Sequence, residues 1–129
     1  MIALPDMLLR TFAEAVEFTR SAAHPAIKLI FDTGHVFQMQ EPILQSYVEA
    51  YDDIALLQLA DMPGRVEPGA GTIDMVPIIA HAIRRGYKGL VDLEHGWSVP
   101  TKSGEEQGLA RLAQIEAAAI AANREENAD

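Results

Sequence analysis

The chain has 129 residues, with 19 acidic against 10 basic side chains, a formal net charge of −9 and no cysteine. This length fits one domain or less, and a content of 49% hydrophobic and 22% charged residues excludes a disordered chain. The negative net charge has the wrong sign for binding nucleic-acid phosphates. No apolar run is long enough to span a bilayer. Without cysteine, disulfides and thiolate chemistry are excluded. We therefore expect a cytoplasmic α/β protein that binds neither nucleic acid nor a membrane.

Helical and strand-like patterns alternate along the chain. In chain order, they predict a helix over 8–21, a strand over 26–31, a helix from 42 to about 51, a strand over 54–60, a polar loop over 61–71, a helix from about 74 to 85, a strand over 89–94, and a helix from 103 to about 122. A capping-box spacing, Ser103–Glu106, opens the last helix, and the polar tail 123–129 is expected to fray. Because strands joined through helices run parallel, the sequence predicts an α/β fold of about three parallel strands and four helices.

A polar side chain stands at or near the end of each predicted strand. These residues are Asp32, Gln58 and Glu94. Taken singly, a strand-end carboxylate more often caps a loop or pairs with a nearby Lys or Arg. The amide of Gln58, however, lies within an apolar run and must find a partner. Because the carboxyl ends of parallel strands meet at one edge, three oxygen donors there would suit a hard divalent cation such as Mg²⁺ or Mn²⁺.

The loop over 61–71 is longer than the usual strand-to-helix connection of about 2–6 residues, and long ordered loops are often functional. Within it, Arg65 offers a bidentate fork to a carboxylate or polyhydroxylated ligand, with Glu67 beside it. The alternative is that the two form a surface ion pair of little energetic value. His35 is another candidate, although taken by itself it is better explained as a loop histidine bonded to backbone carbonyls.

Three segments resemble the hydroxypyruvate isomerase family, within the xylose-isomerase-like sugar isomerase/epimerase superfamily. They are residues 29–35 (LIFDTGH), 57–71 (LQLADMPGRVEPGAG) and 86–94 (GYKGLVDLE). The resemblance, which covers roughly 8–97, implies a (β/α)₈ TIM barrel, with residues 1–122 as its C-terminal portion. It also implies isomerisation of hydroxypyruvate or a related keto-sugar around one divalent metal, for which we expect Mg²⁺ or Mn²⁺.

The resemblance also assigns roles residue by residue. It implies three metal ligands: Asp32, Gln58 and Glu94. It implies three substrate contacts: His35, Arg65 and Glu67. Glu94 additionally resembles a catalytic carboxylate, which would move a proton between the two carbons of the isomerising unit.

The family's second catalytic carboxylate is a Glu at the end of the preceding strand, and residues 1–6 hold no such Glu. We therefore expect a truncated barrel, and the sequence leaves open whether it is active or inactive alone. The alternative function is a non-catalytic fragment or oligomeric binding module. Three parallel strands would leave two open edges and an uncovered apolar face, which favour association. The sequence thus predicts a homo-oligomer that binds a small keto-acid or sugar.

Overall fold

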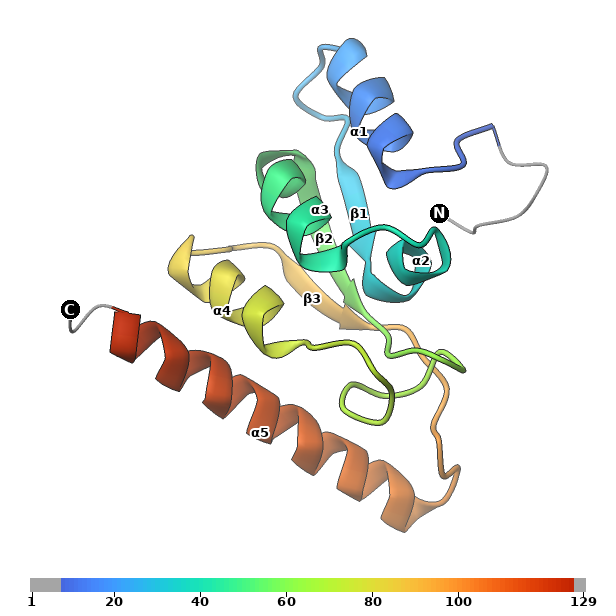
Figure 1. Cartoon of the computed structure of the whole chain (residues 1–129), viewed down its shortest axis with the longest axis vertical. Helices are drawn as coiled ribbons and strands as arrows, with labels where there is room; N and C mark the ends of the chain where they lie inside the picture. Colours follow the sequence, from blue (N-terminus) through green and yellow to red (C-terminus); the bar gives the residue numbers. More distant parts are fainter. Residues whose placement is uncertain (1–7, 127–129) are drawn as a thin grey trace. The chain divides into compact units, whose positions relative to one another are not determined.

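The computed structural model describes residues 8–126, which form five α-helices, one short 3₁₀ helix and three strands (Figure 1). These residues divide into two compact units. The first unit holds the described residues up to Leu59 together with Gly89–Leu93, and the second holds residues 60–88 and 94–126. The predicted α/β class is confirmed.

The first unit is built on a three-stranded sheet of order β1-β2-β3 in which every pairing is parallel (Figure 1). The strands are β1 (Leu29–Asp32), β2 (Ile54–Leu59) and β3 (Leu90–Leu93). The three predicted strands are therefore confirmed, although each is shorter than its apolar run. The register pairs Asp32 with Gln58, and Gln58 with Asp92, so that one polar row crosses the sheet.

Helices α1 (Phe12–Ser21) and α3 (Ile43–Ala50) cover one face of this sheet through an aromatic core. The ring of Phe31 on β1 lies 5.0 Å from that of Phe12 on α1 and 5.1 Å from that of Tyr47 on α3, centroid to centroid. All three side chains are buried. Each such burial contributes about 2 kcal/mol, so this cluster fixes both helices on the same side of β1.

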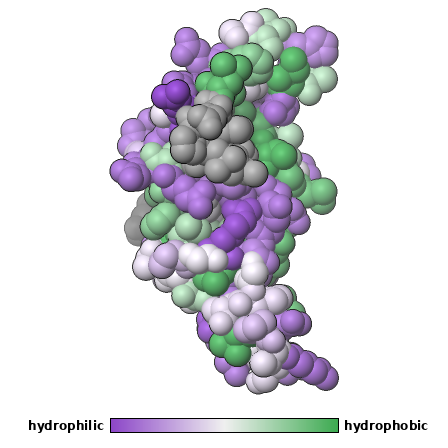
Figure 2. Space-filling model, turned by 90° about the vertical axis from the view of Figure 1, so that its right-hand side faces the viewer, coloured by the Kyte–Doolittle hydropathy of each residue, from purple (hydrophilic) through white to green (hydrophobic). Residues whose placement is uncertain are grey.

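The other face of the sheet carries Ile30, Leu56 and Leu90, which occupy paired positions in the three strands. Because neighbouring residues of a strand point to opposite faces, these side chains lie on the side away from Phe31. Ile30 is 50% exposed and Leu90 is 76% exposed. We call this row the open face. On the side of the molecule drawn in Figure 2, hydrophobic residues lie at the surface among hydrophilic ones.

Helix starts differ from the predicted ones because threonine side chains cap them. Helix α1 begins at Phe12 rather than Leu8, since Thr11 and Glu14 form a reciprocal capping box. Helix α5 (Lys102–Glu126) begins one residue before the predicted Ser103 cap, and the Thr101 hydroxyl accepts a hydrogen bond from the backbone N–H of Gly104. The helix continues through residues 123–126 of the predicted tail, and residues 127–129 lie outside the described part.

Two short helices were not predicted. Helix α2 (Thr33–Gln38) follows β1 directly, where the sequence indicates only a turn, because the Asp32 carboxylate caps the N–H of His35 in its first turn. The 3₁₀ helix η1 (Tyr51–Asp53) leads from α3 into β2. A cap that is also the last residue of a strand is hard to recognise from periodicity alone.

The second unit pairs helix α4 (Val76–Arg84) with α5 (Figure 1). Asn123 joins them, because its amide donates to the Ala80 carbonyl at 2.9 Å and accepts from Arg84 at 3.0 Å. His81 on α4 is buried; burial first, and then the charges of Arg84 and Arg85, lower its pKa. Between residues 8 and 126, no helix is both long and apolar enough to cross a bilayer.

Candidate functional site

Asp32 lies at the carboxyl end of β1 and is only 2% exposed. One of its carboxylate oxygens, Oδ1, accepts the backbone N–H of His35 at 3.0 Å, and the other lies 3.7 Å from His35 Nε2. Capping of α2 therefore brings a predicted metal ligand and a predicted substrate contact side by side. The sequence spacing, three residues at a strand-to-helix junction, is what produces this geometry.

Gln58 is the neighbour of Asp32 on the adjacent strand. Its side-chain Nε2 donates to Asp92 Oδ2 at 3.0 Å. The partner that the sequence requires for this amide is therefore Asp92, which sequence reasoning missed. Asp92 stands two residues before Glu94 in an alternating pattern, and that alternation was the available indication.

The polar side chains at this end of the first unit carry oxygen atoms of the kind that bind a divalent cation. A carboxylate from Asp32 and an amide oxygen from Gln58 are oxygen ligands of the kind that Mg²⁺ and Mn²⁺ prefer, so these two residues fit such an ion in donor chemistry. No cluster of three or more His, Cys, Asp or Glu that could hold a metal occurs among residues 8–126. Glu94, the third predicted ligand, belongs to the second unit.

In the second unit, the loop after β2 is organised by Asp61, whose side chain is completely buried. Its carboxylate accepts four backbone N–H groups at 2.8–2.9 Å, from Met62, Gly69, Gly71 and Ile73. At Gly71 a Cβ would clash with Asp61 Oδ1 and the Met62 carbonyl, so only glycine allows this close approach. Sequence reasoning named the loop but missed the residue that holds it together.

The tip of this loop carries Arg65. Asp61 and Val66 exchange two backbone hydrogen bonds, at 2.8 and 2.9 Å, and the tight turn between them puts Arg65 at φ 51°, in the left-handed region. A non-glycine residue there costs on the order of 1 kcal/mol. The guanidinium donates to Glu94 Oε2 at 2.9 Å, and the Arg65 carbonyl accepts the N–H of Gly96. A predicted substrate contact and the predicted catalytic carboxylate therefore lie together.

Glu67 is held by protein groups on every side. It is 1% exposed, and its carboxylate accepts the backbone N–H of Ser98 at 2.7 Å, the Ser98 hydroxyl at 2.6 Å and the guanidinium of Arg111 on α5. Burial alone raises the pKa of Glu67, but the Ser98 hydrogen bonds and the Arg111 charge outweigh it and lower the pKa to about 2. Glu67 therefore ties the loop to the segment that follows Glu94.

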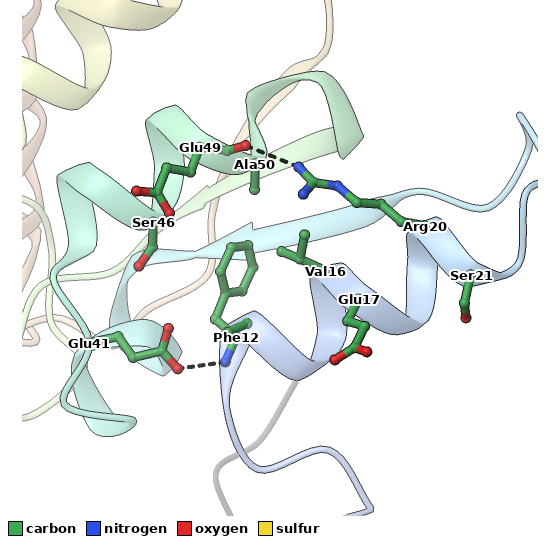
Figure 3. Close-up of a pocket in the computed structure, with 10 residues that line it drawn as sticks. Phe12, Val16, Glu17, Arg20, Ser21, Glu41, Ser46, Glu49 and Ala50 are labelled. Atoms are coloured by element: carbon green, nitrogen blue, oxygen red, sulfur yellow. Dashed lines mark hydrogen bonds between the residues drawn. The ribbon is translucent and has the colours of Figure 1, made fainter.

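A hollow of about 490 Å³ lies elsewhere, between α1 and α3 of the first unit (Figure 3). Phe12 and Val16 line it with several acidic side chains. Its polar groups are largely matched from within: Glu41 accepts the N–H of Phe12 at 2.7 Å, and Arg20 donates to the Glu49 carbonyl at 3.1 Å. The hollow is a groove between α1 and α3, and none of the predicted site residues lines it.

The parallel sheet and the polar groups that follow its strands are features of α/β barrels. Residues 2–115 match the family described as "Xylose isomerase-like TIM barrel". The chain belongs to this family. The predicted superfamily is thus confirmed, whereas the narrower resemblance to hydroxypyruvate isomerase stays a prediction.

The chain is also similar to individual proteins in sequence and in structure. A 3-dehydroshikimate dehydratase of Pseudomonas putida is 28% identical over 125 residues, which cover 84% of this chain and 20% of that protein. Among solved structures, the E. coli 3-keto-D-glucoside 4-epimerase YcjR has a TM-score of 0.72 at 20% identity, covering 87% of this chain and 41% of its own. The D-psicose 3-epimerase of Clostridium cellulolyticum H10 has a TM-score of 0.66 at 23% identity, covering 96% and 46%.

A further neighbour is the IOLI protein, solved with a bound zinc atom, with a TM-score of 0.62 at 18% identity; the match covers 92% of this chain and 45% of that one. The chain spans less than half the length of these solved structures and a fifth of the dehydratase. At sequence identities of 18–23%, the similarity to these solved structures establishes the fold alone.

Proposed function

We propose that this chain supplies part of a metal-dependent isomerase or epimerase site for a small keto-acid or keto-sugar, of the hydroxypyruvate isomerase type. The observation that carries the proposal is the register of Asp32 with Gln58 at the carboxyl end of a parallel sheet, with His35 bonded to Asp32. The epimerases and the zinc-containing protein among the structural neighbours support this assignment.

The proposed roles are those that the family resemblance assigns to these residues. Asp32, Gln58 and Glu94 are the proposed ligands, and a bound divalent cation would supply a Lewis acid that stabilises negative charge on the substrate oxygens. Glu94 would take the proton from the carbon beside the carbonyl and deliver it to the carbonyl carbon, while the hydroxyl proton passes to the former carbonyl oxygen. The Glu94 side chain is 61% exposed, so a ligand can reach it.

Arg65 and His35 are the proposed substrate contacts. The strained backbone of Arg65 is consistent with a functional role, because such conformations persist mainly where the surroundings impose them. Its guanidinium would bind a substrate carboxylate or hydroxyl in place of Glu94. Substrate binding by Glu67 stays a prediction, and its contacts with Ser98 and Arg111 favour a positioning role for this residue.

Proton exchange tests this function. With Mn²⁺ in D₂O, the protein should catalyse deuterium incorporation into the carbon beside the carbonyl of hydroxypyruvate or of D-psicose, followed by mass spectrometry against a protein-free background. Glu94→Gln should reduce the rate at least about a hundredfold, because proton transfer by a positioned group is worth that much. The matched control is Glu105→Gln on α5, which should exchange like the wild type.

The substrate that becomes labelled distinguishes an isomerase from an epimerase. Labelling of hydroxypyruvate alone supports the isomerase, and labelling of D-psicose alone supports an epimerase. The absence of exchange with either substrate at every Mn²⁺ concentration would instead favour the alternative, a non-catalytic binding module.

We also propose that the chain associates with copies of itself through the open face. Leu90 is 76% exposed and Ile30 is 50% exposed, and apolar surface of this kind is normally covered by another surface. Size-exclusion chromatography with light scattering should give a multiple of the monomer mass, and Leu90→Lys should shift it to the monomer. Leu44→Lys on α3, a residue 40% exposed, is the control and should leave the mass unchanged. A monomeric wild type at high concentration would refute this association.

A further inference from the structure

One polar residue in the row across the sheet has no role in the proposed site. Asp32, Gln58 and Asp92 occupy paired positions in β1, β2 and β3. Paired residues of parallel strands face the same side, so the row lies on the same side of the sheet as the open face. Asp92 is exposed, and yet its carboxylate is engaged by the strand beside it.

The engagement fixes the orientation of the Gln58 amide. A primary amide has an NH₂ group that only donates and an oxygen that only accepts, and an ionised carboxylate only accepts. The group facing Asp92 Oδ2, at 3.0 Å, must therefore be the NH₂ of Gln58. The amide oxygen, the only atom of this side chain that binds a hard cation, is then on the branch away from Asp92.

We propose that Asp92 is a positioning residue, which holds the NH₂ of Gln58 so that its amide oxygen is presented to a divalent cation. This inference rests on the proposed metal site. Without the carboxylate, the amide would exchange between two orientations, of which only one offers oxygen to the ion. Groups that orient a metal ligand typically change metal affinity about 10- to 100-fold, and we expect the lower end for so exposed a pair.

Two variants of Asp92 separate positioning from direct coordination. Asp92→Ala removes the acceptor, whereas Asp92→Asn keeps a carbonyl oxygen that can accept the same N–H and removes only the charge. Asp74→Ala, at an exposed aspartate of the second unit, is the matched control. Because Asp92 is exposed, all three proteins should unfold within a few degrees of the wild type, and thermal unfolding checks this.

The first measurement is made without metal. In ¹H–¹⁵N spectra, the Gln58 side-chain NH₂ resonances, assigned by their loss in Gln58→Leu, should move toward those of free glutamine in Asp92→Ala. They should stay near their wild-type position in Asp92→Asn. Unchanged resonances in Asp92→Ala would overturn the proposal, whatever the metal does.

The second measurement is the dissociation constant for Mn²⁺, obtained by electron paramagnetic resonance. Asp92→Ala should weaken binding about tenfold, and Asp92→Asn less than about threefold. An equal loss in both variants would show that the charge of Asp92 acts on the ion directly, and an unchanged constant in Asp92→Ala would show no role; either overturns the proposal. A wild type that binds no Mn²⁺ at all would overturn the proposed metal site itself, and the cation role of Asp92 with it.

Discussion

Replacing Asp61 by Ala is expected to lower the free energy of unfolding by about 4 kcal/mol. The reason is that the buried carboxylate accepts four backbone N–H groups of its own loop, and Ala leaves all four without it. Each hydrogen bond to a charged group is worth about 1.5–3 kcal/mol, and the sum is reduced because the loop relaxes and water enters. Urea denaturation followed by circular dichroism measures the change.

The matched control for this variant is Asp74→Ala. Asp74 is exposed and accepts one backbone N–H, that of Val76, so its loss should cost about 1 kcal/mol. Asp61→Asn should fall between the two, because an amide offers one acceptor oxygen where the loop presents donors to both. If Asp61→Ala unfolds within about 1 kcal/mol of the wild type, the four bonds do not hold the loop as described.

Replacing Glu67 by Gln is expected to destabilise the protein by about 3 kcal/mol at neutral pH. The pKa of Glu67 is lowered from 4.5 to about 2 in the folded protein, so the folded state favours the ionised carboxylate more strongly than the unfolded state does. This contribution is complete above pH 4.5 and is lost as the pH falls toward 2. A glutamine keeps only one acceptor oxygen, so its NH₂ group faces either the Ser98 N–H or the Arg111 guanidinium and can accept from neither.

The measurement is the free energy of unfolding as a function of pH. Glu67→Gln should flatten the wild-type decline between pH 4.5 and 2, while Glu105→Gln on α5 should keep it. The lowered pKa of His81 acts in a separate window, because the unfolded histidine gains a proton below pH 6.5 and the folded one resists it. A Glu67→Gln curve parallel to the wild type below pH 4.5 would contradict the assignment.

The sheet was predictable from the sequence, because its strands are apolar on both faces and are separated by helical periods long enough for parallel crossovers. The sequence places Asp32 and Gln58 at or near the ends of two of those runs, but their register is set by the pairing of β1 with β2. Asp92 is not apparent as a strand-end residue because the run over 89–94 continues to Glu94 in the sequence, whereas β3 ends at Leu93. Strand ends depend on pairing with neighbours, which periodicity does not report.

The sequence predicts that the loop over 61–71 is ordered, but it does not predict the contacts that hold it. Its length and its prolines and glycines indicated an ordered functional segment, and Arg65 and Glu67 were both selected within it. That Glu67 faces inward depends on Ser98 and Arg111, which lie 31 and 44 residues further along the chain. No local pattern carries such information, because a charged residue in a loop is usually solvated.

These distant partners also constrain when the loop can form. The contacts of Asp61 are local, within 12 residues, so they can arise as soon as the loop itself has been synthesised. Those of Glu67 need Arg111, and hence a helix that emerges from the ribosome more than forty residues later. The nascent chain can therefore close the turn that carries Arg65 early, whereas the contact of Glu67 with Arg111 forms only after α5 has docked.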